Sequence, residues 1–567
     1  MRSPKPSPIL SLSVAAACGF LPILASAQLR ISEFQADNLD DLDDEDGQTS
    51  DWIEIHNTGT TEVSLDDWFL TDNENNLSKW AFPKGLSLDP DAYLVVFASE
   101  KNQHTAQTIF QRSPIKSTHT NFRLALEGEY LALVQPDGET VEHEFAPTYP
   151  MQVGNTSYGL NDAGEAVYFV EVTPGQANEG GAASIGPIIE EVTNLTGEPD
   201  LEIHDEIVIS ATVVPTVGEV SEVTLFHRLM FRSESSTTML DDGAAPDAKA
   251  GDGIYTAAFG WKSLFGSQLN PGEMIRYRVE AKDDLGNLQN LPLYHDPDDS
   301  DQYFGTIAAN PSLRTSNLPI LHWFVENPNS ANTDRGTKGA VYYLGEFYDN
   351  TQFDIHGQST RGFPKKAYDF DFNSGHRFKF REGEDRVKDV NILTNWADKS
   401  KIRNTLAYTW QTECQVPAHF AFPIRIEQNG AFHSTADMVE DGDGIYLDRV
   451  GLRSDGALYK IYNTLNTAGG AEKKSRKWED DDDLTDFING ITKGSASERI
   501  AYAYDNVNIP DMVNFLAAKA IYNNTDFGHK NYYVYRDTGG TNEWTILPWD
   551  VDLSLGRLWT GSQTYFR

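Results

Sequence analysis

The sequence predicts a multidomain chain in which two all-β sandwich domains precede one α+β domain. The first observation is the length, because 567 residues exceed what one domain usually holds. The second is the pattern up to about residue 307, where short apolar runs alternate with clusters of Asp, Asn, Gly and Pro. The third is a change near residue 318, after which helical periodicity and basic motifs enter the chain. Separate blocks of strands and helices are typical of an α+β arrangement.

Residues 1–27 have the pattern of a signal peptide. They combine a basic start with a mostly apolar stretch over residues 9–24, and Ala25-Ser26-Ala27 fits the small-x-small cleavage pattern. We therefore expect a Sec-type leader that is cleaved near Ala27 and a mature protein that is secreted or held at the cell surface. Removal of the leader leaves Cys414 as the one cysteine, which excludes an intrachain disulfide.

The composition is strongly acidic. Asp and Glu number 85 against 45 Lys and Arg, and the formal net charge is −40. Such a chain repels phosphates, so we expect no nucleic-acid partner. We interpret the acidity mainly as a source of solubility in a salty or calcium-containing exterior. After the leader, no apolar run in the sequence is long enough to span a bilayer, so we expect no membrane span.

Residues 28–180 are expected to form the first sandwich. Residues 51–57 alternate polar and apolar side chains, and further short β runs follow. This segment resembles the lamin tail domain, and the resemblance rests on residues 31–34, 51–57, 65–68 and 173–178. It implies an immunoglobulin-like sandwich that binds a cell-surface or extracellular ligand and carries no chemistry.

Residues 185–307 are expected to form a second β domain, of immunoglobulin or fibronectin type, after a Gly-rich linker. Asp241, Asp247 and Asp252 lie in a Gly-rich loop that resembles loops of secreted modules. Two interpretations stay open: the carboxylates hold Ca²⁺, or they only shape turns. The acidic run at 37–46 leaves the same two interpretations, although it departs from the EF-hand pattern.

The clearest chemical signal lies near the end of the chain. Asp526 is followed by Asn531, and Asp550 comes after two short apolar runs that predict a β-hairpin. Protein kinases use this layout, with a catalytic-loop Asp-x-x-x-x-Asn, a hairpin and a metal-binding Asp. We therefore predict that Asp526 orients the acceptor hydroxyl, and that Asn531, Asp550 and Asp552 bind Mg²⁺. The alternative for Asp550 and Asp552 is an ordinary strand end with solvated carboxylates.

A basic segment at residues 356–368 is the candidate for binding nucleotide phosphates. Arg361, Lys365 and Lys366 lie within six residues of an otherwise acidic chain. Gly357 and Gly362 would allow the backbone to approach a phosphate closely. The order of residues is not that of a Walker A motif. The structural alternative is that this basic loop only pairs with its acidic surroundings.

Residues 318–567 are similar to the spore-coat protein H (CotH) kinase family, an atypical secreted kinase-like family. The similarity rests on residues 356–368, 391–393, 398–404, 458–460, 523–535 and 547–556. It implies an atypical protein-kinase-like fold and phosphorylation of Ser or Thr hydroxyls of a protein substrate with ATP and Mg²⁺. Carried over, Asp526 is the catalytic carboxylate, Asp550 the Mg²⁺ ligand, and the Arg361/Lys366 region contacts phosphate. Glu440 stands where the family has an acidic residue after a strand, and is carried over as a nucleotide-binding residue.

The sequence also departs from the family pattern. His356 stands where the family usually has Gly, and the family's helical tail has no counterpart before Arg567. A complete domain and one truncated at its C-terminus both stay open. The competing function is a surface adhesion or structural protein whose kinase-like domain is inactive. A metal-dependent hydrolase is disfavoured, because no pair of histidines has zinc-ligand spacing.

Overall fold

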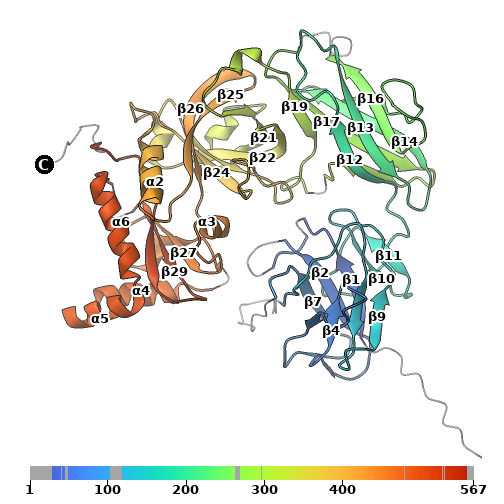
Figure 1. The fold of residues 1–567 in the computed structure, drawn as a ribbon, viewed down its shortest axis with the longest axis horizontal. Coiled ribbons are helices and arrows are strands. Elements are labelled where there is room, and N and C mark those ends of the chain that lie inside the picture. The colour runs from blue at the N-terminus through green and yellow to red at the C-terminus, as the bar shows by residue number, and fades with distance from the viewer. Residues whose placement is uncertain are drawn as a thin grey trace, which may run out of the picture.

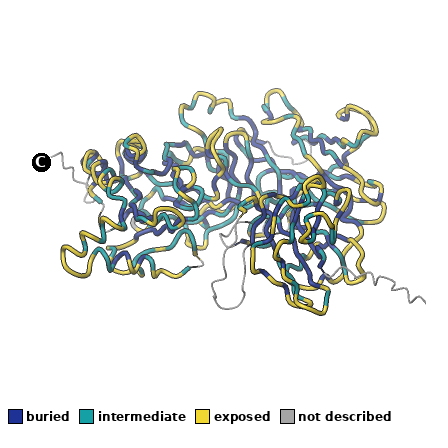
Figure 2. Tube along the Cα trace, turned by 60° about the horizontal axis from the view of Figure 1, so that its bottom comes forward, coloured by how far each residue is buried: buried dark blue, intermediate teal, exposed yellow. Residues whose placement is uncertain are grey.

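The computed structural model describes residues 29–39, 41–44, 49–102, 118–261, 269–294, 296–477, 479–526, 528 and 530–557. The expected signal peptide and parts of the acidic run at 37–46 lie outside these residues. The chain folds into three groups of elements, and most of the elements are strands (Figure 1). Buried segments follow the strands, whereas the connecting turns are exposed (Figure 2). Within the described ranges, no helix has the length and apolar character needed to cross a membrane.

The first group of elements, blue to cyan in Figure 1, is built from strands alone. They are β1 (Leu29–Gln35), β2 (Asp51–Asn57), β3 (Val63–Ser64), β4 (Phe69–Thr71), β5 (Trp80–Ala81), β6 (Ser87–Leu88), β7 (Tyr93–Ala98), β8 (Leu131–Val134), β9 (Val141–Phe145), β10 (Ser157–Leu160) and β11 (Ala166–Phe169). One antiparallel sheet has the order β11-β10-β1-β2-β7, and a second has the order β5-β4-β8-β9. Strand alternation turns Ile31 and Ile53 of the first sheet toward Leu70 and Leu133 of the second, so both sheets share one core.

Two buried glutamates lie side by side in the first sheet. Glu33 of β1 is directly opposite Glu54 of β2, and neither is exposed to solvent. Thr173 Oγ1 donates to Glu33 at 2.7 Å, and the backbone N–H of Gly175 donates to Glu54 at 2.6 Å. The two carboxyl groups therefore hold the segment that leads out of this sandwich. Burial raises the pKa of Glu54 to about 8, and burial also raises the pKa of Glu33.

We expect the first sandwich to lose stability as the pH rises from about 4.5 to about 8. The pKa of Glu54 is higher in the folded chain than in the unfolded chain, so the protonated carboxyl favours folding. Its ionisation removes about 1.4 kcal/mol for each pH unit within that window. Calorimetric unfolding of the full chain at mildly acidic and mildly alkaline pH measures the effect. Glu54→Gln should flatten the dependence, and an unchanged pH slope in that variant would contradict the assignment.

The second group of elements, mainly green in Figure 1, again consists of strands. They are β12 (Ile188–Asn194), β13 (Glu206–Val214), β14 (Val220–Leu229), β15 (Ser235–Thr238), β16 (Ile254–Gly260), β17 (Met274–Asp283), β18 (Leu288–Leu291) and β19 (Phe304–Ile307). One sheet has the order β12-β13-β16, and the other has the order β15-β14-β17-β18, with β19 also paired to β17. Ile207, Ile209, Val223 and Val279 pack between them.

The third group of elements begins with a closed barrel that the sequence patterns did not predict. Its strands are β20 (Ile320–Phe324), β21 (Thr337–Tyr343), β22 (Glu346–His356), β23 (Ala367–Asp371), β24 (Asp389–Leu393), β25 (Ala421–Gln428) and β26 (Ala431–Glu440). They close in the order β20-β21-β22-β23-β24-β26-β25, and the parallel β20–β25 pair completes the ring. Aromatic side chains fill the barrel, with Trp323 contacting the rings of Phe353 and Phe370.

Helices and a smaller sheet follow the second half of the barrel. They are α2 (Arg403–Glu413), α3 (Gly444–Arg449), β27 (Ala457–Ile461), β28 (Ala471–Lys473), α4 (Asp482–Thr492), α5 (Ala496–Asn506), α6 (Ile509–Ile521), β29 (Tyr532–Arg536) and β30 (Trp544–Pro548). Apolar periodicity at residues 401–410 and 510–521 predicts two helices, and the structure has α2 and α6 there. The predicted hairpin is the antiparallel pair β29–β30, in the sheet β28-β27-β29-β30.

The second sandwich and the barrel share a buried interface. Met274 and Ile307 of the sandwich pack with Phe324, Tyr342 and Phe347 of the barrel in one apolar cluster. Beside this cluster, Arg276 of β17 lies 3.5 Å from Asp349 of β22. Asp349 is 2% exposed and also accepts the backbone N–H of Tyr303 at 3.0 Å. These contacts make the second sandwich a structural support of the barrel.

Candidate active site

Two backbone bonds hold the Asp526 loop against the segment that carries Asp550. Helix α6 ends just before the loop, and the hairpin β29–β30 leads from the loop to Asp550. The N–H of Thr525 donates to Leu553 O at 2.9 Å, and the N–H of Trp549 donates to Asn531 O at 3.3 Å. The hairpin therefore brings together residues that are distant in sequence.

Asp526 and Asn531 are in direct contact. Asn531 Nδ2 donates to Asp526 Oδ2 at 2.9 Å, which leaves the amide oxygen of Asn531 for another partner. The N–H of Asp550 donates to Tyr408 Oη of α2 at 3.1 Å. Asn531 and Asp550 have φ angles of 66° and 45°, in the left-handed region that Asn and Asp tolerate better than most residues. Backbone of this kind is often kept where it aims a functional side chain.

A cavity of about 830 Å³ opens above these residues. Asp526, Asn531, Asp550 and Asp552 all line it, and Arg361 of the basic segment lines it as well. The barrel provides a second wall through β22, β23 and β24, which present Asp354, Asp369, Asp371, Asp389 and Asn391. The predicted catalytic residue Asp526 and the three predicted metal ligands thus face one space.

The electrostatics of this cavity favour a divalent cation. Burial raises the pKa of Asp550, and the neighbouring Asp526 raises it further. Burial and then Asp550 raise the pKa of Asp552 to about 8. Carboxylates crowded in this way resist joint ionisation until a cation neutralises them. Their oxygens and the amide oxygen of Asn531 are the hard ligands that Mg²⁺ prefers, so the residues present fit that ion.

Three of the residues predicted to contact the nucleotide, Lys365, Lys366 and Glu440, do not line the cavity. Lys366 Nζ donates to Arg361 O at 2.6 Å, and Lys365 Nζ donates to Asn395 Oδ1. Glu440 is 1% exposed and accepts from Arg449 Nε at 2.8 Å. Each of these charges is therefore already engaged in a contact within the protein. The structure places Arg361 alone, of the four predicted nucleotide-binding residues, at the cavity wall.

Sequence reasoning missed a second group of charged residues in the cavity. Asp441, Lys460 and Lys474 line it, and both ammonium groups approach the same carboxylate. Lys460 lies in the segment 458–460, on which the family resemblance partly rests, but the sequence patterns predicted no function for this lysine. Asp441 directly follows Glu440. Glu440 is the last residue of β26, and the acidic residue just past the end of this strand was the signal that the sequence offered.

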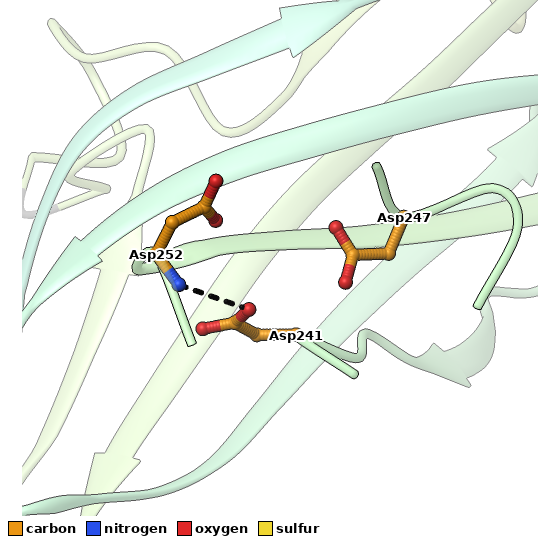
Figure 3. Close-up of side chains that lie close together, drawn as sticks. All are labelled: Asp241, Asp247 and Asp252. Atoms are coloured by element: carbon orange, nitrogen blue, oxygen red, sulfur yellow. Dashed lines mark hydrogen bonds between the residues drawn. The ribbon is translucent and has the colours of Figure 1, made fainter. Parts of the chain in front are cut away.

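The aspartates of the Gly-rich loop in the second sandwich also come together. The carboxylates of Asp241, Asp247 and Asp252 offer oxygen atoms that all lie within 4.8 Å of one another (Figure 3). Asp241 accepts the N–H of Gly251 at 2.6 Å and that of Asp252 at 3.3 Å. Turn geometry and cation binding therefore use the same side chains here, so the contacts alone favour neither interpretation.

Comparison with known families finds two matches along the chain. Residues 353–566 match the family model described as CotH kinase protein, and residues 24–145 match the model of the Lamin Tail Domain. The chain carries a lamin tail domain and a CotH kinase domain. The CotH match begins within β22, so the first two barrel strands precede it, and it includes Asp526, Asn531 and Asp550.

One curated protein is similar to the CotH domain region. The inner spore coat protein H of Bacillus subtilis (strain 168) is 24% identical to this chain over 264 residues. The aligned part covers 43% of this chain and 70% of that protein. This similarity supports a CotH-like family for the C-terminal part of the chain.

Proposed function

We propose that this chain is a secreted or cell-surface kinase that transfers the γ-phosphate of ATP to Ser or Thr hydroxyls of extracytoplasmic proteins. The observation that carries the proposal is the convergence of Asp526, Asn531 and Asp550 on one cavity. The family match of residues 353–566 supports the same chemistry at the level of the domain.

In the proposed reaction, Asp526 orients the acceptor hydroxyl and takes its proton. The hydroxyl oxygen forms a bond to the γ-phosphorus while the bond from that phosphorus to the β–γ bridging oxygen breaks, and ADP leaves. Asn531 holds the Asp526 carboxylate through its amide N–H groups. Asp550, Asp552 and the amide oxygen of Asn531 would hold Mg²⁺, which supplies charge neutralisation at the phosphates.

The β domains have a separate proposed role. The lamin tail domain and the second sandwich would bind a cell-surface or extracellular ligand and so bring the CotH domain to its protein substrate. Carboxylates line the barrel wall of the cavity and would repel the phosphates of a nucleic acid, so we propose no nucleic-acid partner.

A transfer assay tests the proposed kinase activity. The full chain is incubated with γ-labelled ATP, Mg²⁺ and dephosphorylated casein, and label on protein is measured. We expect transfer that depends on Mg²⁺ and is lost in Asp550→Asn. Asp505→Asn, an exposed position on α5 outside the cavity, is the matched control. Absence of transfer by the unaltered chain favours the adhesion function, and transfer that survives Asp550→Asn contradicts the site.

We also propose that the loop of Asp241, Asp247 and Asp252 binds Ca²⁺. Bound Ca²⁺ should stabilise the second sandwich, by about 2.7 kcal/mol at a concentration one hundred times the Kd. Thermal unfolding with Ca²⁺, and with a chelator, measures the shift. Asp252→Asn should abolish the shift, whereas Asp242→Asn, in the same loop but outside the cluster, should keep it. An unfolding temperature that does not respond to Ca²⁺ would mean that the aspartates only shape the loop.

A further inference from the structure

Lys460 stands apart from the other lysines of the CotH domain because it is buried and still faces the cavity. It lies on β27, is 7% exposed and lines the same space as Asp526 and Asp550. A charged side chain with so little exposure needs a partner, because burial of an isolated charge is costly. The partner is Asp441, whose Oδ1 atom lies 3.6 Å from Lys460 Nζ.

A second lysine holds Asp441 more tightly. Lys474 Nζ lies 2.8 Å from Asp441 Oδ2, which is the distance of a charged hydrogen bond. The lysines keep the pKa of Asp441 well below its usual range against the opposing effect of burial, so this carboxylate is ionised. The separation of 3.6 Å at Lys460 exceeds a normal N–H···O bond. Asp441 therefore orients the Lys460 ammonium without consuming its hydrogen-bonding capacity.

Lys460 is also close to the predicted metal ligands. Its Nζ atom lies 4.1 Å from the centre of the Trp549 ring, and Trp549 directly precedes Asp550. A cation over an aromatic face is held in place by the ring. Metal-binding carboxylates and phosphate-binding cations must lie near each other, because both act on one polyphosphate. Lys365 and Lys366, in contrast, do not line the cavity, although each contacts a residue that does, Asn395 and Arg361 respectively.

Two further carboxyl groups lie near Lys460, Lys474 and Asp441. Asp389, on the barrel wall, has a pKa raised by burial and then by Asp441. Glu472 lies 3.7 Å from Lys474, and 45% of its side chain is exposed at the rim. Two ammonium groups, of Lys460 and Lys474, thus meet the Asp441 carboxylate in an otherwise acidic cavity.

We propose that Lys460 binds the phosphates of the nucleotide, and that Asp441 and Lys474 position it. This inference rests on the proposed kinase function and moves the phosphate contact from the basic segment at 361–366 to β27. In this arrangement, the ion pair with Lys474 holds the Asp441 carboxylate in place while Lys460 donates its hydrogen bonds to the phosphates.

Calorimetric titration of the full chain with a non-hydrolysable ATP analogue and Mg²⁺ tests the inference. Lys460→Met should weaken binding by about 10-fold or more, because a charged hydrogen bond is lost. Lys460→Arg should restore part of the affinity. Lys366→Met should bind like the unaltered chain, and so should Lys473→Met, a neighbouring lysine outside the cavity lining. Thermal unfolding of each variant separates loss of binding from loss of fold.

Inorganic tripolyphosphate is the second probe, and it separates the inference from the proposed function. If the chain binds tripolyphosphate but not the ATP analogue, and Lys460→Met removes that binding, the phosphate site stands while the kinase function falls. If the ATP analogue binds and Lys460→Met leaves its affinity unchanged, the kinase function stands and the inference is overturned. An equal loss in Lys473→Met or Lys366→Met also overturns it, as does a chain that binds neither probe.

Discussion

Asp526→Asn is expected to lower the rate of phosphoryl transfer by about 10²- to 10⁴-fold, which is the usual contribution of a positioned general base. The amide has the shape of the carboxylate but cannot take the proton of the acceptor hydroxyl. The contact from Asn531 at 2.9 Å can persist, since an amide oxygen also accepts an N–H. The geometry of the loop should therefore survive the substitution. Single-turnover transfer measures the rate, and calorimetry measures the nucleotide affinity.

The division between rate and affinity decides the role of Asp526. A general base contributes to the reaction step, so affinity for the nucleotide and Mg²⁺ should change little. A matching loss of affinity would make Asp526 a metal ligand instead. An unchanged rate would show that the acceptor hydroxyl is oriented by another group. Asp505→Asn on the exposed face of α5 serves as the control for a lost surface charge.

Asp349→Ala is expected to reduce the free energy of unfolding of the barrel and second sandwich by about 3–5 kcal/mol. The substitution leaves the Arg276 guanidinium buried at the interface, with its partner at 3.5 Å removed. It also removes the acceptor of the Tyr303 N–H. Calorimetric unfolding of the full chain measures the loss, and small-angle scattering shows whether the two groups separate.

The double variant Arg276→Met with Asp349→Leu is the control for this interface. It removes both charges and keeps apolar volume beside the cluster of Met274 and Phe347. We expect it to be more stable than Asp349→Ala, because neither charge is left buried alone. A double variant that is no better than the single one would assign the loss to packing. A small loss in Asp349→Ala would show that Arg276 reaches solvent or another partner.

The local parts of the site were the predictable ones. Asp526, Asn531 and Asp550 are joined by one hairpin, so their spacing along the chain nearly determines their spacing in space. The β29–β30 pair follows from two short apolar runs, and helix α6 follows from apolar periodicity. The buried glutamates Glu33 and Glu54 carried no such signal. A polar residue on a strand is expected to face water, and it is the pairing of β1 with β2 that buries both.

The lysines predicted to contact phosphate do not line the cavity, for a physical reason. Lys365 and Lys366 are adjacent to strand β23, and a strand of a closed barrel has one face inside and one outside. Composition cannot tell which face meets the cavity, nor which backbone carbonyl or amide will engage each ammonium group first. The barrel itself was not predicted, because its closure depends on the pairing of β20 with β25 across about a hundred residues of chain.

The sequence by itself determined the order of the β and α blocks, the lamin tail and CotH resemblances, and the Asp526–Asn531–Asp550 group. These features are encoded in short stretches whose residues meet through local geometry. Only the tertiary structure decided that Asp441, Lys460 and Lys474 share the cavity with that group. Asp441 directly follows β26, Lys460 lies on β27 and Lys474 directly follows β28, and long-range pairing of strands and burial of charge bring them together.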